Sequence, residues 1–377
     1  MTHARRQSMV LVVGFLAIVF IVGGIQPAFD LSAGRRPGVF TVFTQKPNAA
    51  NLRAYEKQLE NESWLTTYIR PPMLTVLFLG MRDGGEKAVR GKSDWLYYKQ
   101  DIAFAVQPFS ASAPASPTSP SPLEAIVAFQ KSLADRGIKL LVVPAPGKPS
   151  VYPEMLISTT KVTANGHTQT FIETLKANGV EAIDLLPAFD AAKRESSAPR
   201  YLAQDTHWTP DGMKIAAEAV AKHLVELNWV SPGDHPYEVK LVSLARSGDV
   251  LKMMNVPAIT ARFQTESLTC EQIVDPATQQ PRADDPASSI LVLGDSFLRI
   301  YERDEPGSAG FSSHLAHALQ QPVASVINDG GASTLVRQQL ARKPELLDGK
   351  RVVVWEFVER DLRFGMEGWK YVALPGQ

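Results

Sequence analysis

The sequence predicts a three-layer α/β fold, in which helices cover both faces of one parallel sheet. From Leu123 onward, short and almost wholly apolar segments alternate with amphipathic segments of helical period. Two of the amphipathic segments stop at a glycine, Gly137 and Gly179, as helices commonly do. Apolar strands that alternate with helices are typical of a parallel sheet buried on both sides. We therefore expect one α/β domain over residues 123–377, preceded by an N-terminal addition.

The N-terminus predicts a membrane anchor over residues 1–30. Arg5 and Arg6 precede the almost wholly apolar run Met9–Ile25, which is longer than a usual signal-peptide core and close to the minimum for a spanning helix. Basic residues stay on the cytoplasmic side, so the rest of the chain should lie on the periplasmic face of the inner membrane. Cleavage after Ala28, which would release a soluble periplasmic form, is the alternative.

Residues 31–107 are expected to form an extension that leads into the α/β domain. Within it, residues 51–65 predict a helix, and residues 73–80 predict a strand or a buried segment. Residues 91–101 indicate a turn followed by an aromatic strand. Residues 108–122 are rich in proline, serine and alanine and carry no charge, which is typical of a flexible loop or linker.

Five helices and five strands are expected in the α/β domain. The predicted helices cover residues 123–137, 168–179, 210–227, 312–321 and 334–347. The predicted strands cover residues 138–146, 180–187, 290–293, 322–329 and 350–358. Residues 229–287 contain several prolines and no sustained periodicity, so we expect them to run over the surface without regular structure.

Composition excludes some classes of function. The chain has 39 basic and 39 acidic residues and a net charge of zero, which argues against a nucleic-acid partner. Its single cysteine, Cys270, rules out an intramolecular disulfide and a cysteine-built metal site. His314 and His317 are three residues apart on a predicted helix, but no carboxylate pattern supports a metal there. We predict no metal and no soluble cofactor.

Two distant motifs supply the side chains of a nucleophilic triad. In "LVLGDSFLRI" (residues 291–300), Ser296 follows an apolar strand, at the edge of a parallel sheet where ligands bind. In "AQDTHWTPDG" (residues 203–212), His207 suits a general base, and Asp205 can orient its ring. Taken singly, each has an ordinary explanation: a helix-capping serine, a loop histidine and a turn-forming aspartate.

These motifs resemble a known family. The order of "DTHWTPDG", "LVLGDSF" and "WEFVERDL", together with "DWLYYKQD" and "VVPAPGKPSVYP", is similar to that in the alginate O-acetyltransferases of the AlgX/AlgJ group. The resemblance covers roughly Gly91–Leu362 and implies an SGNH-hydrolase-like, flavodoxin-like sheet in which the Asp-His block precedes the Ser block. It implies that Ser296 is the nucleophile, His207 the base and Asp205 the orienting acid. With an anchor and no appended carbohydrate-binding module after Leu362, the chain is most similar to the membrane-anchored AlgJ type.

The resemblance also suggests where the oxyanion would bind. In SGNH proteins a glycine N–H completes the oxyanion hole made by the nucleophile's own N–H. "NDGGAS" (residues 328–333) therefore assigns this role to Gly331 or Gly330 beside Ser296, with a plain turn as the alternative.

Six further residues are candidates for substrate contacts. Lys148 and Tyr152 follow a strand end and would line a sugar groove, unless they are solvated loop residues. Arg299 and Tyr301 follow the nucleophile and would contact an anionic polymer, although exposed charges usually bind nothing specific. Glu356 and Arg360 would pair and close the last strand against the site.

The expected function is that of a periplasmic O-acetyltransferase acting on an exported polysaccharide, alginate or another exopolysaccharide. A multispanning membrane-bound O-acyltransferase would supply the acetyl group, because that group must cross the inner membrane. Two alternatives stay open: a carbohydrate acetylesterase that uses the same triad, and a non-catalytic polysaccharide-binding component of an export complex.

Overall fold

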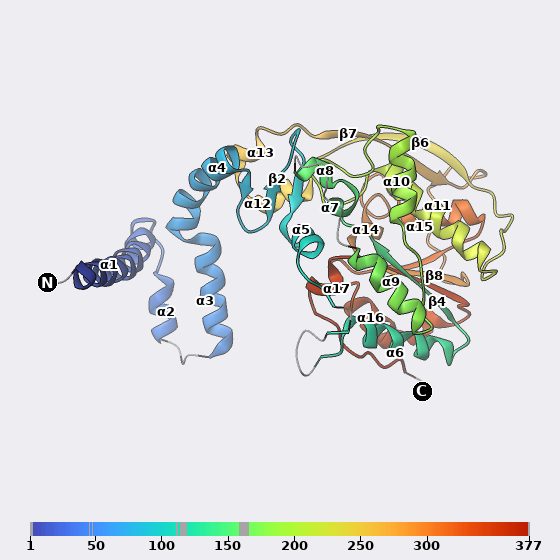
Figure 1. Ribbon diagram of the computed structural model, residues 1–377, viewed down its shortest axis with the longest axis horizontal. Coiled ribbons are helices and arrows are strands. Elements are labelled where there is room, and N and C mark those ends of the chain that lie inside the picture. The colour runs from blue at the N-terminus through green and yellow to red at the C-terminus, as the bar shows by residue number, and fades with distance from the viewer. Residues whose placement is uncertain are drawn as a thin grey trace. The chain divides into compact units, whose positions relative to one another are not determined.

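The chain divides by its internal contacts into two compact units. The computed structural model describes residues 3–44, 46, 48–110, 112–113, 119–157 and 166–375. Unit 1 comprises Met1–Asp83 with Val256–Ala261, and unit 2 comprises Gly84–Asn255 with Arg262–Gln377 (Figure 1). The predicted domain boundaries at residues 30, 107 and 122 remain predictions.

Unit 1 is helical. Its elements are α1 (His3–Ser32), α2 (Gly38–Thr44), α3 (Ala49–Glu62), the π-helical turn η1 (Leu65–Ile69), α4 (Arg70–Met81) and α13 (Pro257–Thr260). Among the described residues, Met9–Ser32 of α1 is long and apolar enough to cross a membrane. A signal sequence has the same properties.

The segment 73–80 is not a strand, as one of its two readings proposed, but lies within α4. Pro71 and Pro72 occupy the first helical turn, where an N–H has no partner to lose. Leu74 and Phe78, four residues apart, form the buried side of the helix. An apolar run of this length does not distinguish a helix from a buried strand by its period.

Unit 2 contains the predicted parallel sheet, in the order β5-β4-β10-β8-β9. The strands are β4 (Lys139–Ala145), β5 (Glu181–Ala182), β8 (Ile290–Gly294), β9 (Ala324–Ile327) and β10 (Val352–Val358). The last strand, β10, lies in the centre of the sheet and pairs with both neighbours: Val354 aligns with Leu141 of β4 and with Val292 of β8. Strand β5 has two residues, shorter than predicted, because α10 already begins at Leu186.

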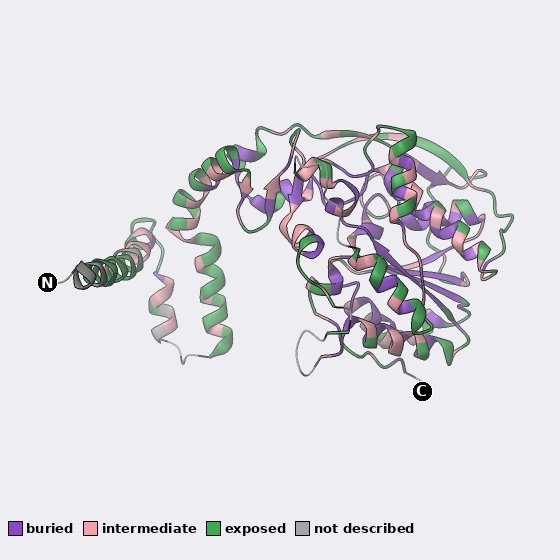
Figure 2. Cartoon of the chain, viewed as in Figure 1, coloured by how far each residue is buried: buried purple, intermediate pink, exposed green. Residues whose placement is uncertain are grey.

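Helices cover both faces of this sheet, which confirms the predicted fold class. Alternate strand residues point to opposite sides: Leu141 and Val143 enter one core, and Leu140 and Val142 enter the other. The first core is completed by α10 (Leu186–Glu195), α11 (Pro210–Glu226) and α15 (Phe311–Leu319). The second is completed by α6 (Pro122–Ala134), α9 (His167–Ala177) and α16 (Leu335–Arg342). The strands between them are buried (Figure 2).

The segment 229–287 differs from the prediction, because it contains regular structure. Strands β6 (Glu238–Arg246) and β7 (Glu266–Val274) form an antiparallel pair, with Val242 opposite Cys270. The helix α12 (Asp249–Met254) directly follows β6. Most of β6 is exposed, so this strand carries only a weak alternation of buried and exposed positions.

Smaller elements complete the described chain. A sheet of β1 (Asp83–Gly84), β2 (Ala88–Arg90) and β3 (Leu96–Tyr98) precedes α5 (Lys99–Val106). The short turns are α7 (Lys148–Val151), α8 (Pro153–Leu156), α14 (Ser296–Arg299), η2 (Pro344–Leu347) and α17 (Asp361–Phe364). Of the predicted linker 108–122, residues 111 and 114–118 lie outside the described residues. Its last residue, Pro122, is the first of α6, where Ser121 and Glu124 form a capping box.

Candidate active site

Ser296 stands where β8 turns directly into α14, at the carboxyl end of the sheet. Asp295 caps this turn, because its Oδ1 accepts the N–H of Phe297 at 2.8 Å. Gly294 is required here, since a Cβ would lie 2.4 Å from Glu356 Oε2 and 2.5 Å from Leu298 Cδ1. The turn therefore presents a half-buried serine hydroxyl at the edge where α/β proteins bind ligands.

His207 lies in a tightly bonded loop before α11. The N–H of Leu202 donates to the carbonyl of His207 at 3.1 Å, and the N–H of Thr209 donates to that of Arg200 at 3.0 Å. Thr209 caps α11 by accepting the N–H of Gly212 at 3.2 Å. A Cβ on Gly212 would lie 2.1 Å from the Arg200 carbonyl, so the loop and the helix can approach only at a glycine. These bonds fix the His207 backbone.

The structure brings Ser296, His207 and Asp205 into one hydrogen-bonded chain. The Oγ of Ser296 lies 2.8 Å from His207 Nε2, although 89 residues separate them. The Nδ1 of His207 lies 2.6 Å from Asp205 Oδ1. With the Nδ1 proton directed to the carboxylate, Nε2 is free to accept the serine proton. The distances expected of a nucleophile, a base and an orienting acid are therefore met.

The electrostatics of this chain favour an ionised Asp205. Burial alone would raise the pKa of the fully buried Asp205, but the neighbouring His207 and Arg246 outweigh burial and lower it below 3.8. The Oδ2 of Asp205 accepts the Nε–H of Arg246 at 3.2 Å. For His207, burial acts to lower the pKa, and the Asp205 carboxylate outweighs it and raises the pKa above 6.5.

Arg246 and Asp249 are functional candidates that sequence reasoning missed. The Oδ1 of Asp249 accepts the N–H of Thr206 at 2.7 Å, and its Oδ2 accepts the Thr206 hydroxyl at 2.6 Å. The N–H of Asp249 donates to Asp205 Oδ2 at 3.1 Å. Burial, and then repulsion from Asp205, raises the pKa of Asp249. Both residues belong to the segment predicted to be irregular; the glycine between β6 and α12 was the available signal for a close approach.

That glycine, Gly248, lets the β6–α12 junction touch the Asp205 loop. A Cβ on Gly248 would lie 1.9 Å from the carbonyl oxygen of Gln204. The close approach is what allows Asp249 to reach Thr206 and Asp205 at the same time.

Asp205, His207 and Asp249 each bring one ligand atom within 4.8 Å of the others, which is a spacing that a metal ion accepts. However, Arg246 already lies against Asp205, and His207 Nδ1 faces the same carboxylate. A cation would have to displace the guanidinium and the Nδ1 proton, so this donor set does not fit a metal. His314, the other histidine considered, faces the carbonyl of Glu271 with Nε2 at 3.1 Å.

The two candidate oxyanion glycines differ in their hydrogen bonding. The N–H of Gly331 donates to the Asn328 carbonyl at 3.1 Å and is committed to a turn. Gly330 has a φ of 64°, in the left-handed region that favours glycine. Among the described residues, no acceptor is found for the N–H of Gly330 or of Ser296. Of the two glycines, Gly330 therefore keeps the role as a candidate.

Lys148 and Tyr152 do not line an open groove. The Nζ of Lys148 is buried and donates to the carbonyls of Leu96 at 2.7 Å and Ala203 at 3.1 Å. Burial lowers the pKa of Lys148 to about 8. The buried Tyr152 hydroxyl accepts the N–H of Arg200 at 2.8 Å. Both side chains tie the loop of His207 to its surroundings, and neither is the solvated loop residue of the alternative reading.

Arg299 and Tyr301 are also held by the protein itself. The Nε of Arg299 donates to Asp329 at 2.9 Å, and its Nη1 pairs with Asp304. Tyr301 is fully buried, and its hydroxyl donates to the Trp208 carbonyl at 3.1 Å. Tyr301 is therefore not accessible to a polymer. A sequence position just after the nucleophile does not reveal that the chain turns inward there.

Glu356 and Arg360 do not pair with each other. Glu356 is fully buried beneath the Ser296 turn, where its Oε2 accepts the N–H of Asp295 at 3.4 Å. Burial, followed by repulsion from Asp295, raises the pKa of Glu356 well above 4.5, which favours a neutral carboxyl group. Arg360 instead pairs with Asp101 of α5 at 2.8 Å and lies over the ring of Tyr98. The predicted pairing was wrong, because Arg360 pairs with Asp101 and Glu356 faces the backbone of Asp295.

Known proteins share this fold and sequence pattern. Residues 88–359 match the family model described as the SGNH hydrolase-like domain of acetyltransferase AlgX. The probable alginate O-acetylase AlgJ of Pseudomonas syringae pv. tomato is 25% identical over 297 residues, which cover 74% of this chain and 70% of that protein.

Two solved structures show the same fold. The O-acetyltransferase domain of Pseudomonas putida AlgJ matches with a TM-score of 0.57 and 22% identity, over 75% of this chain and 93% of that one. Pseudomonas aeruginosa AlgX matches with a TM-score of 0.55 and 19% identity, over 72% of this chain and 62% of that one.

Proposed function

Because the chain belongs to the family of the SGNH hydrolase-like acetyltransferase AlgX, we propose that it transfers acetyl groups to hydroxyls of an exported polysaccharide through an acetyl-serine. The relatives with which it aligns are named probable alginate O-acetylases, so alginate or a similar exopolysaccharide is the proposed acceptor. The observation that carries the proposal is the chain of short contacts from Ser296 Oγ through His207 to the buried Asp205.

The first half-reaction would load the enzyme. His207 Nε2 takes the proton of the Ser296 hydroxyl as Oγ attacks the acetyl carbonyl. The negative charge that develops on the carbonyl oxygen is stabilised by the N–H of Ser296 and by that of Gly330. His207 then gives the proton to the departing group of the donor, and the acetyl group stays on Ser296 as an ester.

The second half-reaction would regenerate the serine. A sugar hydroxyl takes the place of the leaving group, and His207 Nε2 removes its proton as its oxygen attacks the acetyl-serine carbonyl. The bond from Ser296 Oγ to the acetyl carbon breaks, and His207 returns the proton to Oγ. Asp205 stays ionised throughout and stabilises the imidazolium that forms in each half-reaction.

The proposed location is the periplasmic face of the inner membrane, with α1 as the anchor. The apolar segment Met9–Ser32 and the basic Arg5 and Arg6 before it support this orientation. A multispanning membrane-bound O-acyltransferase is the proposed source of the acetyl group.

Two alternative functions use the same scaffold. If water replaces the sugar hydroxyl in the second half-reaction, the protein is a carbohydrate acetylesterase. If Ser296 is never acylated, the protein is a polysaccharide-binding component of an export complex.

The test is acylation of the full chain, purified in detergent, by a small acetyl ester. We expect mass spectrometry of peptides to place one acetyl group on Ser296, and Ser296→Ala to abolish it with a loss of several orders of magnitude in rate. Ser289, just before the other end of β8, provides the matched control, because Ser289→Ala should acylate normally.

Partition of the adduct then separates the functions. An oligosaccharide acceptor should divert acetyl from water to sugar, since a bound hydroxyl has the advantage of proximity. Unchanged acetate release with no acetylated sugar would establish the esterase. If the purified protein forms no adduct, and cells that carry Ser296→Ala still acetylate their polymer normally, the protein is a polysaccharide-binding component.

A further inference from the structure

Helix α4 of unit 1 is apolar on both sides, and one of those sides is uncovered. Arg70 is its only charged residue, at its first position. Leu74 and Phe78 point into unit 1, where α13 packs against the helix. On the opposite side, Met73 is 54% exposed and Val76 is 70% exposed. A helix that is apolar all round is normally buried in a core or in a membrane.

The exposed apolar surface continues along the chain. The π-helical turn η1 runs directly into α4 and exposes Leu65 and Ile69, and α4 adds Leu79 to the same side. We call Leu65, Ile69, Met73, Val76 and Leu79 the bare face. None of these five side chains offers a hydrogen bond, which a specific protein partner would ordinarily require around an apolar centre.

The bare face begins beside the end of the candidate membrane span. The ring of Tyr68 packs edge-on against Phe29 of α1, with centroids 5.7 Å apart. The N–H of Trp64 donates to Gln26 Oε1 at 2.9 Å. Tryptophan and tyrosine are enriched where a membrane meets water. These contacts place the start of η1 at the level where α1 leaves its apolar run, and they lie within one compact unit.

We propose that the bare face of η1 and α4 lies in the boundary between lipid headgroups and acyl chains of the membrane that α1 enters. The proposal rests on the membrane location given under the proposed function, and adds a second point of membrane contact. Lipid satisfies an apolar surface that has no polar groups to orient a partner, and burial of that surface removes it from water.

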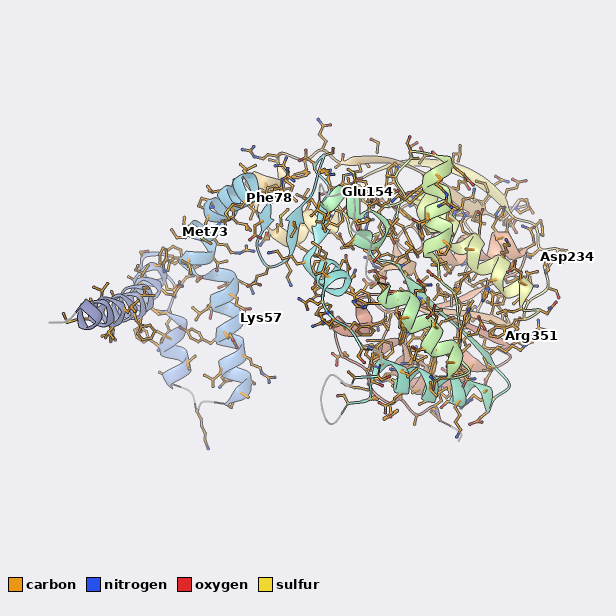
Figure 3. The ribbon with its side chains drawn as sticks, in the orientation of Figure 1. Lys57, Met73, Phe78, Glu154, Asp234 and Arg351 are labelled. Atoms are coloured by element: carbon orange, nitrogen blue, oxygen red, sulfur yellow. The ribbon has the colours of Figure 1, made fainter. Side chains whose placement is uncertain are left out.

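The test measures contact with lipid at three positions of the full chain. A thiol-reactive fluorophore is attached to Leu16→Cys in the span, Met73→Cys on the bare face or Lys57→Cys on the polar helix α3. Figure 3 labels Met73 and Lys57. Each site is exposed, so the core is left intact. The native Cys270 is buried, and burial raises the pKa of its thiol to about 12, so it should not label.

Each labelled protein is reconstituted into vesicles of phosphatidylethanolamine and phosphatidylglycerol, with or without a nitroxide quencher on the acyl chains. We expect quenching at Leu16 and Met73 to exceed that at Lys57 several-fold. Quenching at Leu16 with Met73 at the level of Lys57 would overturn the second contact and leave the anchor in place. Quenching at neither site would overturn both. Acetylation of Ser296, measured on the same samples, reports separately on the proposed chemistry.

Discussion

Arg246 should set both the stability of the Asp205 site and its response to pH. Arg246→Gln keeps an amide near Asp205 but removes the positive charge that lies 3.2 Å from its Oδ2. Asp205 is fully buried, and the Arg246 side chain is 18% exposed, so water replaces the lost charge poorly. The change leaves an ionised carboxylate with a weaker set of partners.

The loss can be scaled from the distance. Two unit charges 3.2 Å apart attract by about 1.3 kcal/mol in water and by about 5 kcal/mol at an effective dielectric constant of about 20. Removing one partner of a buried pair typically costs about 3–5 kcal/mol. Because Arg246 keeps some contact with solvent, we expect Arg246→Gln to lower the free energy of unfolding at neutral pH by about 3 kcal/mol. Urea titration measures it, and Lys370→Gln in the exposed pair with Glu367 should have almost no effect.

The stability difference should depend on pH with a definite sign. The pKa of Asp205 is lower in the folded state than the unfolded value of 3.8. Its ionisation therefore stabilises the fold above pH 3.8, and this stabilisation is lost as the pH falls below that value. Wild type and Arg246→Gln should therefore converge in stability in that acid range. A constant difference down through the acid range would refute the pairing of charge with charge.

Activity gives a second and independent sign. The positive charge of Arg246 lowers the pKa of His207, and the Asp249 carboxylate raises it. The acid limb of the kcat/KM profile reports the pKa of His207, because His207 must be neutral to act as a base. Arg246→Gln should raise this pKa and move the limb to higher pH, and Asp249→Asn should lower it and move the limb to lower pH. Other charges nearby, Asp205 on the ring and Asp304 behind Arg246, are unchanged in both variants. Shifts in one direction for both variants, or none, would refute the reasoning.

Three further predictions concern the surroundings of the site. Gly248→Ala should cost about 1–3 kcal/mol of stability and lower kcat/KM, because its Cβ would meet the Gln204 carbonyl at 1.9 Å. An unchanged kcat/KM would mean that the β6–α12 junction does not hold Asp205 in place. Lys148 has a pKa of about 8 in the folded state against 10.5 in the unfolded state, so the free energy of unfolding should rise with pH across that interval. In urea titrations Lys148→Met should remove this rise. A rise that persists in the variant would mean that another group causes it. Tyr301→Phe removes a buried hydrogen bond worth about 1 kcal/mol and should leave the KM for an oligosaccharide unchanged. A raised KM would indicate that the Tyr301 hydroxyl contacts the sugar after all.

The sequence predicted the sheet well, because both of its faces are buried. Strands such as Lys139–Ala145 and Val352–Val358 are almost wholly apolar, with Lys139 at one end and Glu356 as the exceptions, and the helices between them keep a clear apolar side. The same logic failed for β6, where a mostly exposed strand carries little hydrophobic signal. It left residues 73–80 of α4 open between a strand and a buried segment, because a helix that is apolar all round has no amphipathic period to detect.

In the candidate site, only the residues whose role is indicated by a local sequence motif could be predicted. Ser296 follows a strand, and Asp205 and His207 sit two residues apart, so their types and positions indicated their chemistry. Arg246 and Asp249 reach the same atoms through tertiary contact alone, which no local pattern encodes. Burial could not be predicted either: Lys148 and Tyr301 are ordinary polar residues in sequence, and packing alone places them inside.

The central position of β10 makes the two halves of the sheet depend on a strand that comes after both of them in the chain. Within the sheet, β4 and β5 form one pair of strands and β8 and β9 form another, and only Val352–Val358 joins the two pairs. The loop of His207 follows the first pair in the chain, and Ser296 lies between the two strands of the second pair, directly after β8. A chain that emerges from its N-terminus holds both halves of the site, but no sheet connects them until the last strand arrives. The order of the strands therefore predicts that the triad assembles only after β10 has joined the two pairs.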